Sequence, residues 1–190
     1  LIMVEVAVIG AGAAGLVASR HLLQQGLRPC IFESSHAIGG LWNIGKPGQK
    51  GAVAGRTTTA SALDQLLQQQ QQQQSQQQQQ QRIWDSLSTN LSKHTCSFSD
   101  FRWPDGTSTF PSHTEMNHYL EEYAKTYIPD PDCFKLGCTV TNVKKWNSQD
   151  ASSSSTSATT TIGGGGGYQV EWVEEEEGLQ NKVFDGVVVA

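Results

Sequence analysis

The chain has 190 residues, a net charge of −5 and four cysteines, which bounds it to one domain or slightly more. It carries no basic stripe, so a nucleic-acid partner is not expected, and no apolar stretch reaches membrane-spanning length. Two low-complexity stretches cannot bury enough apolar surface to offset their ordering entropy. Gln68 to Gln81 is glutamine broken only by Ser75, and Ala151 to Gly167 is almost entirely Ser, Thr and Gly.

Cysteine and histidine spacing gives no sign of a disulfide framework or a metal site. The cysteines form no C-x-x-C pair and no signal peptide precedes the first apolar run, so we expect a reducing, cytoplasmic setting, with association of a longer parent protein with the endoplasmic reticulum left open. His113 and His118 are five residues apart and are interpreted as surface or capping residues. Both ends look cut, at Leu1 and Ala190, so we expect a fragment.

A strand, a glycine-rich turn and a helix are expected first. The apolar, β-branched run from Val4 to Ile9 predicts a strand of a parallel sheet. A G-x-G-x-x-G turn follows, with the residues Gly10, Ala11, Gly12, Ala13, Ala14 and Gly15. Its glycines permit a tight turn, close approach to a diphosphate and close helix packing, in that order. The unpaired amides and partial positive charge of the next helix, which is expected to end at Gly26, favour a phosphate there.

A second strand and a second glycine pair sharpen the cofactor prediction. The strand from Pro29 to Phe32 ends in Glu33, about twenty residues past the glycines, where an acidic residue is the expected partner of an adenosine ribose. The sequence Gly39-Gly40-Leu41-Trp42 follows. A second glycine pair lets another loop approach the same diphosphate, which indicates FAD rather than NAD. Trp42 could pack beside the cofactor or belong to the core.

The remaining elements come after a long low-complexity stretch, which we interpret as a surface insertion. Ser112 or Thr114 can cap a helix with Glu115 in its first turn. Apolar residues at helical spacing then predict one buried helix face: Met116, Tyr119, Leu120, Tyr123, Ala124 and Tyr127. Pro129 and Pro131 end this helix. Strands are expected at Phe134–Leu136, Thr139–Trp146, Tyr168–Val173 and Lys182–Asp185, and a buried parallel strand at Phe184–Ala190.

Composition and motifs together divide the chain into five stretches. They are a βαβ unit with the glycine pair (1–44), a poly-Gln insertion (45–82), a continuation of the nucleotide-binding domain (83–146), a Ser/Thr/Gly linker (147–167) and closing strands (168–190). The expected fold class is α/β, a Rossmann-like domain that is incomplete and interrupted by insertions.

Several motifs resemble the flavin-containing monooxygenases over about residues 4–44 and 83–190. The first are the glycine turn, Glu33 and Gly39 to Trp42. More specific is the succession of Thr89-Asn90 before Lys93, then Phe98 to Phe101, then Phe110-Pro111 before a helix. The resemblance implies a flavoprotein with two dinucleotide-binding domains, with the glycine turn, Glu33 and residues 39–42 binding FAD.

The resemblance also implies a mechanism. NADPH would reduce FAD, O₂ would add at flavin C4a, and a small nitrogen or sulfur nucleophile would take the distal oxygen. Asn90 matches the family asparagine near the flavin ring, and Thr89 could assist it or be a turn residue. The NADPH unit would follow Ala190, so the fragment alone is expected to be inactive.

Two other interpretations stay open. One is a disulfide reductase of the same architecture, because Cys133 and Cys138 have C-x4-C spacing, although Leu41-Trp42-Asn43 stands where such enzymes place their cysteines. The other is a non-catalytic remnant that uses the glutamine tract as an interaction module, with no partner indicated.

Overall fold

The computed structural model describes residues 3–43, 86–146, 166–174 and 178–190. The expected poly-Gln insertion and almost all of the Ser/Thr/Gly linker lie outside the described residues. The elements in chain order are β1 (Glu5–Ile9), α1 (Ala13–Gln24), β2 (Arg28–Glu33), the 3-10 turn η1 (Gly40–Trp42), α3 (His113–Tyr127), the 3-10 turn η2 (Pro131–Cys133), β3 (Phe134–Leu136), β4 (Cys138–Trp146), β5 (Gly167–Glu174), β6 (Gly178–Phe184) and β7 (Gly186–Val189).

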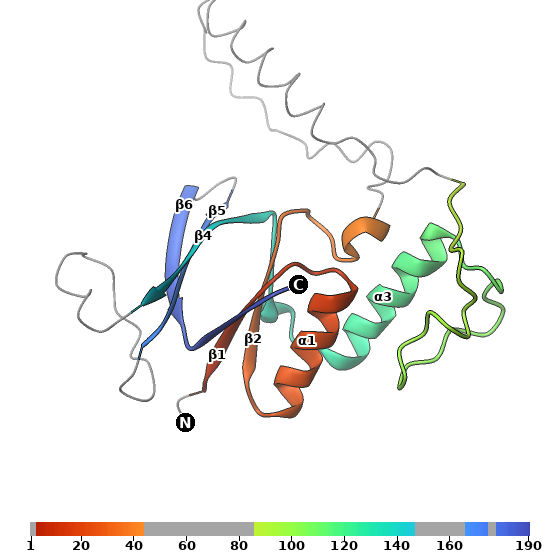
Figure 1. The fold of residues 1–190 in the computed structure, drawn as a ribbon, viewed down its shortest axis with the longest axis horizontal. Helices are drawn as coiled ribbons and strands as arrows, with labels where there is room; N and C mark the ends of the chain where they lie inside the picture. Colours follow the sequence, from red (N-terminus) through yellow and green to blue (C-terminus); the bar gives the residue numbers. More distant parts are fainter. Residues whose placement is uncertain (1–2, 44–85, 147–165, 175–177) are drawn as a thin grey trace, which may run out of the picture.

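The described strands form two sheets. One is parallel, in the order β3-β2-β1-β7, and the other is an antiparallel meander of β4, β5 and β6. Helices α1 and α3 cover one face of the parallel sheet, and the meander covers the other (Figure 1). Long crossovers between parallel neighbours are what a Rossmann-like α/β fold requires. The predicted fold class is therefore confirmed.

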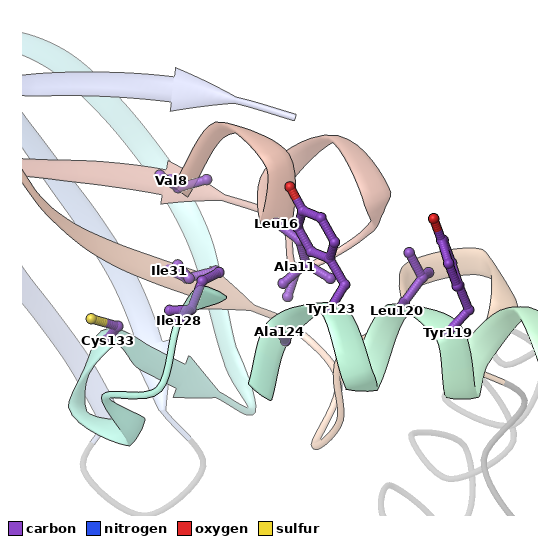
Figure 2. Packing of buried hydrophobic residues seen from close by; sticks show 10 residues of the cluster. All are labelled: Val8, Ala11, Leu16, Ile31, Tyr119, Leu120, Tyr123, Ala124, Ile128 and Cys133. Atoms are coloured by element: carbon purple, nitrogen blue, oxygen red, sulfur yellow. The ribbon is translucent and has the colours of Figure 1, made fainter. Parts of the chain in front are cut away.

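Each face of the parallel sheet has its own hydrophobic cluster, because successive strand residues point to opposite faces. The helix-side cluster contains Val8, Ala11, Leu16, Ile31, Tyr119, Leu120, Tyr123, Ala124, Ile128 and Cys133 (Figure 2). The meander-side cluster contains Ala7, Phe32, Cys138, Val170, Trp172 and Phe184. In β1, Ala7 thus faces the meander and Val8 faces the helices. Because both faces of β1 are covered, its sequence is apolar without alternation.

The prediction for the last strand was partly wrong. Phe184 ends β6 and is 1% exposed, whereas β7 begins only at Gly186. The strand does pair in parallel with β1, as expected. Yet Val189 is 77% exposed, because β7 comes last in the strand order and has β1 as its single neighbour among the described strands.

Candidate functional site

The glycine turn lies where β1, β2 and β7 end. Gly10 N donates to Phe32 O at 2.8 Å, and Ala190 N donates to Ile9 O at 3.0 Å. Gly10 has φ +105°, and a Cβ on it would lie 2.7 Å from Ala190 O. Both the backbone conformation and the close approach of β7 therefore require glycine at this position.

Helix α1 begins immediately after the turn and packs tightly on it. A Cβ on Gly15 would overlap the carbonyl oxygen of Gly10, so glycine at this position lets the helix approach the turn. Gly12 is the N-cap and offers no side-chain cap, and the first turn holds no acidic residue. Ala13 packs on the helix-side cluster, whereas Ala14 is exposed. The amides at this helix start keep the electropositive character that favours an anion.

The two glycine loops face one another. Gly39 N donates to Ala11 O at 3.0 Å, and a Cβ on Gly40 would lie 3.0 Å from Gly12 Cα. A Cβ on Gly12, in contrast, would meet only Gly40 Cα among the described residues, at an ordinary contact distance of 3.8 Å. The packing of the described chain thus explains Gly10, Gly15 and Gly40, but it leaves Gly12 unexplained and its surface open to a ligand.

Glu33 connects the end of β2 to this turn. Its side chain is buried, with 8% exposure. Oε2 accepts from Ala11 N at 2.8 Å, and Oε1 accepts from Ser35 N at 2.9 Å and lies within 3.2 Å of the hydroxyls of Ser34 and Ser35. The carboxylate is therefore hydrogen-bonded beside the glycines. The Ser34 hydroxyl is a donor that a ligand hydroxyl could replace, whereas the single proton of the Ser35 hydroxyl also has Ala37 O as an acceptor at 2.6 Å.

The residues of η1 point in different directions. Leu41 is 51% exposed, whereas Trp42 is half-buried and packs against the helix-side cluster. For Trp42, this contact supports the core interpretation that the sequence left open.

The Thr89-Asn90 turn is fixed at both ends by the chain that leads into α3. Three backbone hydrogen bonds join the two segments: His113 N to Leu87 O (3.0 Å), Thr89 N to Pro111 O (2.8 Å) and Lys93 N to Thr109 O (2.8 Å). Thr89 Oγ1 also donates to Leu91 O at 2.7 Å, which supports its role as a turn residue. Asn90 is exposed between the two fixed ends.

The start of α3 contains a complete capping box, which identifies Ser112 as the cap expected at Ser112 or Thr114. Glu115 N donates to Ser112 Oγ at 3.3 Å, and Ser112 N donates to Glu115 Oε2 at 2.8 Å. Glu115 Oε1 accepts a further bond from Ser108 N at 2.9 Å. The backbone N–H groups of Ser108 and Ser112 lower the pKa of Glu115 to about 2. One carboxylate thus fixes the segment that holds Thr89.

The Phe98–Phe101 turn anchors on the tyrosines of α3. Tyr119 Oη accepts from Phe98 N at 2.8 Å and donates to Phe101 O at 2.6 Å. Both phenylalanine rings and Trp103 pack against Tyr119. In the sequence this motif carried part of the family resemblance. In the structure its hydrogen bonds and ring contacts attach the Phe98–Phe101 turn to α3.

Arg20 of α1 is a residue that the sequence reasoning missed. It forms an ion pair with Asp100, and its guanidinium carbon lies 3.8 Å from the ring centroid of Tyr127. The signal available in the sequence was a charged residue four positions after Leu16, which lies on the buried face of α1. Arg20 thus connects α1 to α3 through Tyr127 and to the Phe98–Phe101 turn through Asp100.

The cysteines do not form the arrangement of a disulfide reductase. Cys133 belongs to the helix-side cluster and Cys138 to the meander-side cluster, on opposite faces of the parallel sheet. Within the described ranges there is no group of three potential metal-binding side chains. No helix in the described part of the chain has the length and apolar character to cross a membrane.

Comparison with known proteins agrees with this arrangement. The family model for flavin-binding monooxygenase-like proteins matches residues 3–59 and 64–190. The flavin-containing monooxygenase FMO GS-OX-like 6 of Arabidopsis thaliana is 33% identical over 76% of this chain, and flavin-containing monooxygenase 5 of Rattus norvegicus is 33% identical over 97%. The chain spans 30% and 27% of these two relatives.

A solved structure shows the same relation. S-allyl-L-cysteine S-oxygenase from Allium sativum matches all of this chain and 36% of its own, with a TM-score of 0.63 and 26% identity. The chain therefore belongs to the flavin-binding monooxygenase-like family, whose members use FAD and NADPH.

Proposed function

We propose that residues 1–190 are the FAD-binding part of a monooxygenase that uses NADPH and O₂ to oxygenate nitrogen or sulfur in a small, soft nucleophile. The observation that carries this proposal is the facing pair of glycine loops, with Gly12 open beside Gly40 and Glu33 bonded at Ala11. The relation to the S-oxygenase from Allium sativum supports a sulfur substrate.

The residues present fit FAD. The diphosphate would take hydrogen bonds from the amides at the start of α1 and lie against the glycine loops, because Gly12 has no side chain to exclude it. Glu33 would accept from the ribose hydroxyls. When bound, FAD supplies the oxygen-activating redox chemistry after reduction by NADPH.

We assign Asn90 and Thr89 to the reacting end of the cofactor. Asn90 is exposed on a turn with both ends fixed, so its amide is available to hydrogen-bond there. Thr89 sets the shape of that turn through its bond to Leu91 O. Positioning on a rigid support is what such a residue contributes, since the cofactor carries the chemistry.

We further propose that NADPH oxidation needs residues that this chain does not contain, because the chain spans under a third of its curated relatives. A cytoplasmic, reducing setting fits the burial of Cys133 and Cys138 as separate core thiols. The placement of these cysteines disfavours the disulfide reductase alternative.

Reconstitution with flavins tests the proposal. The purified chain should bind one FAD, visible by flavin absorbance, and should bind FMN much more weakly, because FMN lacks the adenosine that Glu33 would contact. It should not oxidise NADPH when methimazole or a tertiary amine is added. A well-folded chain that stays colourless with excess FAD would instead favour the non-catalytic remnant. NADPH oxidation by the purified chain would refute the proposal that this step needs residues outside it.

A further inference from the structure

Asn117 is a polar residue of α3 that lies against the second glycine loop. A Cβ on Gly39 would overlap Asn117 Oδ1 and would lie 3.2 Å from its Cγ. The oxygen therefore stands where a side chain at position 39 would begin, so one Cα hydrogen of Gly39 points toward it. Such a C–H···O contact is a weak hydrogen bond that recurs where two backbones or helices approach closely.

The orientation of the Asn117 amide is set from its other end. Nδ2 donates to Glu121 Oε1 at 2.8 Å, one helical turn further along α3. Because a carboxylate can only accept, the nitrogen must face Glu121 and the oxygen must face Gly39. Asn117 Oδ1 is buried and has no conventional hydrogen-bond partner among the described residues. A buried oxygen in this state needs an explanation.

Gly39 is the point at which α3 and the glycine turn meet. Its amide donates to Ala11 O at 3.0 Å, and its neighbour Gly40 faces Gly12. Its φ of +115° is a conformation that other residues rarely adopt. The loop thus has two supports, the backbone of the glycine turn on one side and Asn117 on the other.

We propose that Asn117 is a positioning residue, whose side-chain oxygen holds the Gly39–Gly40 loop in the conformation that receives the cofactor diphosphate. This inference rests on the proposed function. Helix α3 suits the role because its capping box and its tyrosine contacts with the Phe98–Phe101 turn fix it in place. Asn117 need not touch the cofactor, since it acts through Gly39.

The test uses the full chain and five variants. Asn117→Leu keeps the approximate shape and removes the oxygen, and His118→Ala, at an exposed site on the next residue, is the matched control. Asn117→Ala, Gly39→Ala and the double variant Asn117→Ala/Gly39→Ala complete a double-mutant cycle with the wild-type chain. Two quantities are measured: the dissociation constant for FAD by flavin fluorescence, and the melting temperature without FAD.

We expect Asn117→Leu to weaken FAD binding about fivefold to tenfold while its melting temperature stays close to that of His118→Ala. Removing the Asn117 side chain should also make Gly39→Ala at least threefold less harmful to FAD binding, because it relieves the overlap. Unchanged FAD affinity, or a melting temperature that falls in parallel with affinity, would overturn the positioning role.

The cycle also separates this inference from the proposed function. If the wild-type chain fails to bind FAD, the proposed function is wrong. The melting temperatures of the four proteins in the cycle (wild type, Asn117→Ala, Gly39→Ala and the double variant) still show whether the two residues are coupled. Coupling between positions 39 and 117 in melting would support a loop held by Asn117. Additive melting shifts would overturn it.

Discussion

Gly12 and Gly15 belong to one motif but differ in what requires them. Replacing Gly12 by Ala adds a Cβ that meets only an ordinary contact in the described chain. The lower entropy of the unfolded chain favours folding and the poorer N-cap opposes it, so we expect stability within about 1 kcal/mol of wild type. FAD binding should weaken about tenfold or more, because that Cβ occupies the surface left for the diphosphate.

Gly15→Ala is the matched comparison for this prediction. Its Cβ would overlap Gly10 O, so the helix must move and the chain should lose about 1–3 kcal/mol of stability without any ligand. Chemical denaturation and FAD titration of both variants provide the measurements. If Gly12→Ala lowers the free energy of unfolding as much as Gly15→Ala does, the packing of the chain itself requires glycine at position 12, and a ligand is not the reason for it.

The ion pair of Arg20 and Asp100 should respond asymmetrically to substitution. The Arg20 side chain is 10% exposed, whereas that of Asp100 is 42% exposed. Asp100→Ala leaves a buried cation without its carboxylate, but Arg20→Met leaves a carboxylate that water can reach. We expect Asp100→Ala to lower the melting temperature more than Arg20→Met, and the reverse order would contradict this account.

The first two turns of helix α3 support both the Gly39–Gly40 loop and the Thr89-Asn90 turn. Ser112 and Glu115 hold the segment that pairs with Thr89, and Asn117 contacts Gly39. Placing both contacts on one capped helix fixes the glycine loop and the Asn90 turn relative to one element. Sites supported by regular elements are held more precisely than sites on loops alone.

The Glu115 carboxylate gives this helix a pH dependence with a definite sign. Its pKa is about 2 in the folded chain, below the ordinary 4.5, because the N–H groups of Ser108 and Ser112 bond its charged form. The stabilisation is therefore complete above pH 4.5 and is lost as the pH falls toward 2. Glu115→Gln can offer only one acceptor oxygen to the two amides, so it should cost about 1 kcal/mol at pH 7, allowing for solvent screening.

Urea denaturation from pH 7 to pH 2 measures this effect. The wild-type chain should lose stability relative to Glu115→Gln as the pH falls, and the two should converge near pH 2. Glu122→Gln is the control, because Glu122 pairs on the surface with Lys125 and should change stability much less. Parallel curves for wild type and Glu115→Gln would show that the Ser108 and Ser112 bonds contribute nothing.

Local sequence patterns predicted the helices and strands well, but they could not predict the contacts between distant segments. The Val4–Ile9 run and the Ser112 to Glu115 spacing carry their own periodicity and capping chemistry, so β1 and α3 formed as expected. That Glu115 would also bond Ser108, or that Asn117 would meet Gly39, depends on how separate segments pack. No spacing rule encodes such contacts.

At the scale of the whole molecule, the parallel sheet is shared by two hydrophobic layers built from distant parts of the sequence. Phe32 packs on Trp172 and Phe184, with ring centroids 4.9 and 5.8 Å apart, while Ile31 beside it faces the helices. Segments on both sides of the glutamine tract thus contribute to each of the two clusters. The sequence predicted a strand at Pro29–Phe32, but not which later strands would cover it.

This shared core predicts that the glutamine tract is dispensable for folding. Deleting Gln68 to Gln81 removes about a third of the residues between Asn43 and Ser86. The loop-closure entropy then changes by only about 0.4 kcal/mol. The melting temperature and the FAD dissociation constant should stay at their wild-type values. Loss of FAD binding in the glutamine deletion would mean that the tract belongs to the nucleotide-binding domain rather than being inserted into it.

Deleting the much shorter Phe98–Phe101 turn should unfold the chain, because it removes the hydrogen bonds and ring contacts that hold α3.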